Sequence, residues 1–85
     1  MKQQTALTIK YDDKEEQLAV GDMVELAWQE GRSLVPFISE VVRLTPKRAY
    51  LRSGGYVTTR GDVDGADRII NYKGKASKGV ARPGN

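Results

Sequence analysis

Five cations and two tyrosines, with no acidic residue among them, occupy the stretch between Val41 and Asp62. The cations are Arg43, Lys47, Arg48, Arg52 and Arg60, and the tyrosines are Tyr50 and Tyr56. Arginine and lysine contact phosphates and release counterions, while a tyrosine ring stacks on an unpaired base. The pattern predicts a surface that binds nucleic acid. Alternating arginine and tyrosine is also ordinary on a solvated strand, so the same residues are equally compatible with binding to a protein.

A β-hairpin is predicted to position these side chains, with strands at residues 48–52 and 56–60 and a loop of Ser53, Gly54 and Gly55. Such a loop, with a glycine at positive φ, pairs residue 52 with 56, 50 with 58 and 48 with 60. One face then carries Arg48, Tyr50, Arg52, Tyr56, Thr58 and Arg60, and the other carries Ala49, Leu51, Val57 and Thr59. A two-residue loop would mix the two sets, because a one-residue slip reverses every side chain.

The charge is unevenly distributed along the chain, although the total is only +3. Residues 1–40 hold four cations and eight acids, a net charge of −4, and residues 41–85 hold ten cations and three acids, a net charge of +7. This asymmetry favours an anionic partner for the second half, either nucleic acid or an acidic protein surface. A pair of solvated faces that compensate each other is the alternative interpretation.

Composition argues against an enzyme. The 85 residues include no cysteine and no histidine, which removes the thiolate zinc site, the cysteine nucleophile and the commonest general base. A chain of this length forms one domain with a thin core and scarcely encloses a substrate pocket. We therefore expect a non-enzymatic protein without a cofactor or a metal.

Hydrophobic residues alternate with a period close to two, which predicts strands. The expected strands cover residues 6–11, 23–29, 34–44 and 68–73 in addition to the hairpin. In the second of these, Val24, Leu26 and Trp28 share one face, and Trp28 is interpreted as a core residue. In the third, Phe37, Ser39, Val41 and Arg43 share one face and Ile38, Val42 and Leu44 the other, with Pro36 at an edge or in the incoming loop.

Three segments are expected to lie outside strands. The acidic cluster at residues 12–17 is predicted to be a loop or a single helical turn. The segment 61–67 is predicted to be a compact loop or one 3₁₀ turn, and its three aspartates lack the order and the distal glutamate of a calcium loop. Residues 74–85 contain almost no large apolar side chain, so they are predicted to form a disordered basic tail after a single domain at residues 1–73.

Five or six short strands with tight turns describe a small all-β barrel. Residues 18–73 resemble the SH3-like small barrels, in the broad sense that includes Tudor-type and KOW-type modules. The likeness is carried by Gly21-Asp22-Met23-Val24 opening a strand, the long strand at 37–44, the hairpin at 48–60 and the turn before Ile69-Ile70. This resemblance implies a five- or six-stranded barrel that binds nucleic acid, peptides or proteins through one hairpin and its adjoining loops.

Two other functions compete with nucleic-acid binding. The first is a small adaptor or inhibitor, of the kind found among accessory proteins of phages and mobile elements, that docks on a partner protein through the acidic edge at residues 12–16. The second is a homo-oligomeric structural protein, in which the edge near Pro36 or the first strand pairs between copies. No run of about 20 apolar residues predicts a membrane span, and the first ten residues lack the apolar core of a signal peptide, so we expect a cytoplasmic protein.

Overall fold

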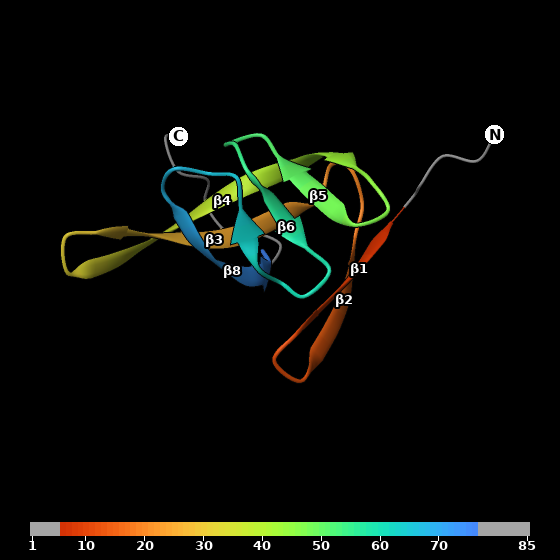
Figure 1. Cartoon of the computed structure of the whole chain (residues 1–85), viewed down its shortest axis with the longest axis horizontal. Coiled ribbons are helices and arrows are strands. Elements are labelled where there is room, and N and C mark those ends of the chain that lie inside the picture. The colour runs from red at the N-terminus through yellow and green to blue at the C-terminus, as the bar shows by residue number, and fades with distance from the viewer. Residues whose placement is uncertain (1–5, 77–85) are drawn as a thin grey trace.

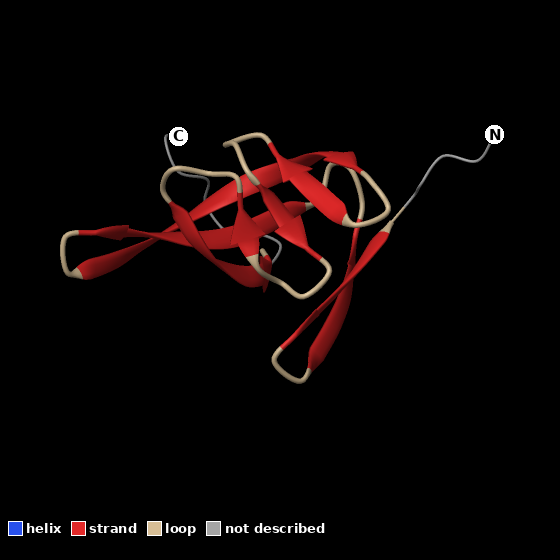
Figure 2. Cartoon of the chain, in the orientation of Figure 1, coloured by secondary structure: helices blue, strands red, loops and turns tan. Residues whose placement is uncertain are grey.

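A computed structural model gives the structure of the protein, and it describes residues 6–76. The regular elements in this range are all strands (Figure 2). They are β1 (Leu7–Tyr11), β2 (Lys14–Leu18), β3 (Met23–Glu30), β4 (Ser33–Leu44), β5 (Arg48–Leu51), β6 (Tyr56–Thr58), β7 (Val63–Asp64) and β8 (Ile69–Lys75). Within residues 6–76 there is no helix of the length and apolarity that crossing a membrane takes.

Six of the strands form one curved sheet, in the order β7-β6-β5-β4-β3-β8. β3 to β7 follow one another as an antiparallel meander, and β8 returns to pair with β3. The two outer strands, β7 and β8, approach each other, so the sheet curls into a nearly closed barrel (Figure 1). The prediction of a small all-β barrel is confirmed at this level.

The core lies inside the curl of the sheet and is completed by the first hairpin. Val24 and Leu26 of β3 are fully buried, as the alternation predicts. Trp28 is only partly buried and packs against the edge of the core. The other fully buried side chains include Ile9, Leu18, Val41 and Val57.

The prediction of a loop or a helical turn for residues 12–17 holds for residues 12–13 and is wrong for residues 14–17, which belong to β2. Asp12 and Asp13 form the tight turn between β1 and β2, with Asp12 at a φ of 50°, and the two glutamates that follow belong to β2. Leu18, fully buried, anchors this acidic strand to the core. Tertiary packing of one apolar residue thus outweighs the poor strand propensity of its charged neighbours. The hairpin projects from one side of the barrel (Figure 1).

The β5–β6 hairpin forms in a register two residues from the predicted one. Tyr50 opposes Tyr56, and Arg48 opposes Thr58. The Leu51 N–H donates to the Gly55 carbonyl at 3.1 Å, so the three-residue loop is Arg52 to Gly54. Because strand faces repeat every two residues, this shift preserves the predicted faces of most side chains. The buried set is Ala49, Leu51 and Val57, while Thr59 lies beyond the end of β6 and is exposed, against the prediction.

Three smaller expectations can be compared with the structure. Pro36 lies within β4 and not in a loop. It lies at an edge, because its half of β4 pairs with β3 alone, whereas β5 pairs only with Val41 to Leu44. The segment 61–67 contains the two-residue strand β7. β8 continues through Gly74 and Lys75, so the first two residues of the predicted tail belong to the sheet, and residues 77–85 lie outside the described part of the chain.

Candidate functional site

A stacked row of two arginines and two tyrosines runs across the outer face of β4, β5 and β6. The guanidinium carbon of Arg43 lies 4.2 Å from the Tyr50 ring centroid, and that of Arg48 lies 4.3 Å from the Tyr56 ring centroid. The two rings are 5.3 Å apart, with their planes at 57°. Both arginines are well within the distance at which a cation is attracted to a ring face. We call these four residues the Arg–Tyr ladder.

A β-bulge brings Arg43 into the ladder. Plain alternation places Arg43 on the same face as Val41, and Val41 is fully buried. The register between β4 and β5 shifts by one residue between these two positions, so that Val41 opposes Leu51 and Arg43 opposes Tyr50. An extra residue in one strand reverses the facing of everything beyond it. Val42 is that residue, and the arginine therefore emerges on the solvent side.

The ladder is joined by a hydrogen bond and carries uncompensated positive charge. The Arg48 guanidinium donates to the Tyr50 hydroxyl at 3.3 Å. This hydrogen bond, together with the positive charges of Arg48 and Arg43, lowers the pKa of Tyr50, because the cations favour the phenolate. Neither arginine forms a salt bridge within residues 6–76. An acidic neighbour is Asp64, which opposes Tyr56 across β6 and β7 and interacts electrostatically with Arg48.

Lys47 and Arg60 extend this basic surface. Together with Arg48 they line an open hollow of about 400 Å³, to which Thr58, Thr59 and Asp62 also contribute. Lys47 lies in the turn between β4 and β5, and Arg60 lies in the turn that follows β6 rather than opposite Arg48 in the ladder of the hairpin. Like the two ladder arginines, they have no salt-bridge partner in the described part of the chain.

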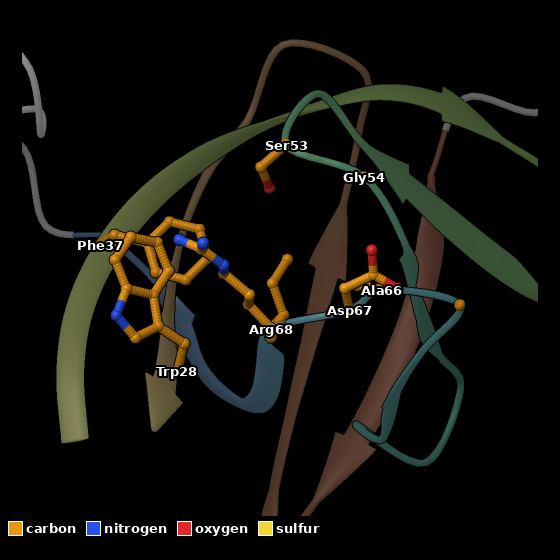
Figure 3. Close-up of a pocket in the computed structure, with 9 residues that line it drawn as sticks. Trp28, Phe37, Ser53, Gly54, Ala66, Asp67 and Arg68 are labelled. Atoms are coloured by element: carbon orange, nitrogen blue, oxygen red, sulfur yellow. The ribbon is translucent and has the colours of Figure 1, made fainter. Parts of the chain in front are cut away.

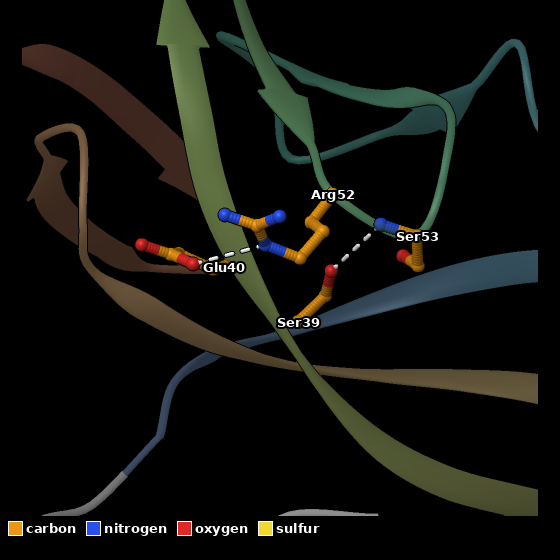
Figure 4. A network of polar contacts seen from close by, with 4 residues as sticks. All are labelled: Ser39, Glu40, Arg52 and Ser53. Carbon is orange, nitrogen blue, oxygen red and sulfur yellow. Dashed lines mark hydrogen bonds and ion pairs between the residues drawn. The ribbon is translucent and has the colours of Figure 1, made fainter.

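The structure separates Arg52 from the other predicted site residues. Its Nε donates to the Glu40 carboxylate at 3.1 Å, and its backbone N–H donates to the Glu40 carbonyl at 2.9 Å. The next residue, Ser53, donates its N–H to the hydroxyl of the buried Ser39 at 3.2 Å (Figure 4). These contacts draw the turn toward β4, which explains why the strands pair two residues earlier than predicted. The charge of Arg52 is thereby neutralised.

A second hollow, of about 340 Å³, opens beside the β5–β6 turn. Its aromatic wall consists of Trp28 and Phe37, whose ring centroids are 4.7 Å apart. The remaining lining comes from two connecting segments, with Ser53, Gly54, Gly65, Ala66, Asp67 and Arg68, and from Ile69 at the start of β8. In Figure 3 the Arg68 side chain extends toward the two rings, and Asp67 lies below the turn that carries Ser53. We call this site the Trp28 hollow.

Sequence reasoning missed the Trp28 hollow because it treated Trp28 as a core residue. The alternation of β3 correctly places Trp28 on the inward side, next to Leu26. It contains no information on whether the distant turns at residues 53–54 and 65–68 would cover the ring. The one signal available was position, since Trp28 stands two residues before the end of β3 at Glu30.

The acidic residues show no grouping of the kind that binds metals. Among residues 6–76 no set of three or more histidine, cysteine, aspartate or glutamate side chains is placed to hold a metal ion. Asp64 instead accepts a hydrogen bond from the Gly65 N–H at 2.8 Å, a contact typical of aspartate in turns. In the first hairpin, Glu15 lies 3.7 Å from Lys10, and Glu16 accepts from the Lys75 N–H at 3.3 Å.

Comparison of the chain with protein-family models, with curated proteins and with solved structures finds no match. The function is therefore inferred from the geometry of the site.

Proposed function

We propose that this protein is a non-enzymatic binding module, an SH3-like barrel in the broad sense, that binds single-stranded nucleic acid through the Arg–Tyr ladder. The observation that carries the proposal is a group of four cations that form no salt bridge within residues 6–76. Arg43 and Arg48 stack on the two tyrosine rings, and Lys47 and Arg60 line the adjoining hollow together with Arg48. All four are exposed, and exposed cations neutralise phosphates and release their counterions.

In this proposal the cations contact the phosphates of the nucleic-acid backbone, and the tyrosine rings fix the positions of the two arginines. Tyr50 and Tyr56 each carry a guanidinium on a ring face, which fixes two long arginine side chains before any ligand arrives. Ordering such side chains on binding costs about 0.5–1.5 kcal/mol each, and the ladder reduces that cost. A flexible single strand can follow the curved outer surface of β4 to β6 more easily than a stiff duplex can.

A double variant in the ladder and a control variant outside it test the proposal. Fluorescence anisotropy is measured with short labelled oligothymidylate and oligouridylate, and the Arg43→Gln, Arg48→Gln double variant is expected to bind at least about tenfold more weakly than the wild type. The control is Arg32→Gln, which removes an exposed cation in the distant turn between β3 and β4 and should leave affinity almost unchanged. Circular dichroism verifies the fold of each variant. Absence of binding by the wild type at low salt would overturn the proposal.

Docking on a partner protein is the second candidate, and the first hairpin favours it. Asp12 and Asp13 are exposed at its tip and form no salt bridge within the described residues. A basic protein surface would complement this acidic turn. In a pull-down after nuclease treatment, one dominant protein that is lost with an Asp12→Asn, Asp13→Asn variant and retained with the ladder variant would favour this candidate over nucleic acid.

A further inference from the structure

The Trp28 hollow has features of a ligand site rather than of a packing defect. Its volume of about 340 Å³ falls in the range of small-molecule sites. The Trp28 ring is partly exposed, unlike the fully buried Leu26 beside it. An open aromatic wall of this kind accepts a flat, unsaturated ligand by stacking.

Three polar side chains at the hollow have no partner in residues 6–76. The Ser53 hydroxyl, the Asp67 carboxylate and the Arg68 guanidinium take part in no hydrogen bond or salt bridge there. The Arg68 guanidinium carbon lies over the Trp28 ring at 6.0 Å from its centroid, at the outer limit of a cation–π contact, so this contact is weaker than those of the ladder. The hollow thus combines an aromatic stacking surface with a hydrogen-bond acceptor, the Asp67 carboxylate, and a group of hydrogen-bond donors, the Arg68 guanidinium.

The hollow adjoins the Arg–Tyr ladder directly. Gly65 lines the hollow, and a Cβ atom built on it would lie 2.9 Å from the Tyr56 ring. One glycine therefore lies between the last ring of the ladder and the hollow. A nucleic-acid strand whose phosphates contact the ladder can therefore place a neighbouring base in the hollow.

The polar groups favour guanine among the four bases. Guanine presents two adjacent donors, N1–H and N2–H, to a carboxylate such as that of Asp67, and its O6 and N7 accept from an arginine. Adenine, cytosine and uracil or thymine each place an acceptor beside the donor on the same edge, which a carboxylate repels. Recognition of the Watson–Crick edge of an unstacked base against aromatic rings is how proteins read single strands.

We propose that the Trp28 hollow binds one unstacked guanine base of a nucleic-acid strand, stacked against Trp28 and Phe37 and read by Asp67 and Arg68. This inference rests on the function proposed above and adds base specificity to it. The ladder supplies affinity without regard to sequence, and the hollow supplies the preference.

Trp28 is the single tryptophan of the chain, so its fluorescence reports on the hollow alone. The experiment titrates the protein with oligothymidylate or oligouridylate, whichever binds, and with the same oligomer carrying one guanosine, inosine or adenosine. We expect the guanosine oligomer to bind about tenfold more tightly than the parent and to quench Trp28. Inosine, which lacks the N2 amino group, should lose most of that gain, and adenosine should lose all of it.

Two variants separate this inference from the proposed function. Asp67→Asn should abolish the preference for guanosine while retaining binding of the parent oligomer. Arg48→Gln should weaken all oligomers by a similar factor and preserve the preference. Binding of the parent oligomer with equal affinity for all four probes and unchanged Trp28 fluorescence would overturn the inference alone. Failure of every oligomer to bind, or quenching of Trp28 by a basic peptide instead, would overturn both proposals.

Discussion

The salt dependence of nucleic-acid affinity is the sharpest test of the Arg–Tyr ladder, because its magnitude follows from the number of unpaired cations. In a single strand, each phosphate that a protein cation neutralises contributes about −0.7 to the slope of log affinity against log salt concentration. Four cations at the site, Arg43, Lys47, Arg48 and Arg60, have no salt bridge within residues 6–76. If all four contact phosphates, the slope is about −2.8, and affinity falls about 50-fold between roughly 50 mM and 200 mM salt.

The double variant Arg43→Gln, Arg48→Gln leaves two of these cations, so its slope should be about −1.4 and its affinity should fall only about sevenfold over the same range. Arg52→Gln is the control. Arg52 is bound to Glu40 at 3.1 Å, so removing it also changes the net charge by one but takes no phosphate contact away. Its slope should stay near −2.8. Anisotropy titrations with one labelled oligonucleotide at several salt concentrations give all three slopes.

Two results would refute this reasoning. A wild-type slope near zero would mean that phosphates do not neutralise the ladder, whatever the affinity at low salt. A slope that falls in Arg52→Gln by half or more of its fall in the Arg43→Gln, Arg48→Gln variant would mean that overall charge, and not the placement of the cations, governs binding. Thermal unfolding verifies that each variant is folded. We expect every variant to fold, because an exposed cation–π contact stabilises the fold by only about 0.5–1 kcal/mol.

Three further predictions concern an acidic neighbour of the ladder and the attachment of the first hairpin. Asp64→Asn keeps an oxygen that can accept from the Gly65 N–H and removes a negative charge near the ladder, so anisotropy should show severalfold tighter oligonucleotide binding; weaker binding would contradict the proposed interface. Gly61→Ala places a Cβ 2.5 Å from the Tyr11 Cβ, whereas Gly31→Ala, also at positive φ, meets nothing within 4 Å, so the first should destabilise the fold by about 1–3 kcal/mol more in denaturant unfolding. Burial and the nearby Glu16 carboxylate raise the pKa of Tyr11. Its neutral form is therefore favoured by folding, and the associated stability is present below about pH 10 and lost as the pH rises through the folded pKa. Tyr11→Phe should flatten this alkaline loss in unfolding curves, and an unchanged loss would assign it to another group.

The faces of the hairpin were predictable, whereas its register was not. A period of two determines which side chains share a face, so Arg48, Tyr50 and Tyr56 remain together after a slip of two residues. The slip itself depends on contacts with a different strand, where the turn is held by Glu40 and Ser39. No pattern within the hairpin contains that information, since the partners are 12 and 14 residues away in the sequence.

The side of the sheet on which Arg43 lies illustrates a second limit of prediction from sequence. Residues 34–44 alternate regularly, and only the bulge at Val42 makes the exposed Arg43 and the partly buried Leu44 change places. A bulge is favoured here because it keeps a charged side chain out of the core at the cost of one unpaired residue. The acidic strand β2 is a similar case, in which the burial of Leu18 decides the structure of its charged neighbours.

The Arg–Tyr ladder and the Trp28 hollow differ in how readily they accept a stacked base. Tyr50 and Tyr56 already contact guanidinium groups and each other, so a base that stacks on either ring in place of its guanidinium breaks a cation–π contact worth about 0.5–1 kcal/mol to form a stack of about 1–3 kcal/mol. At the Trp28 hollow the corresponding contact is weaker, because Arg68 lies 6.0 Å from the ring centroid, at the outer limit of a cation–π interaction. Base stacking is therefore more favourable in the hollow than on the ladder. In the proposed binding mode the tyrosines preorganise the arginines, so Tyr50→Phe, which retains the ring and loses the hydrogen bond from Arg48, should weaken binding much less than Tyr50→Ala in the same anisotropy assay.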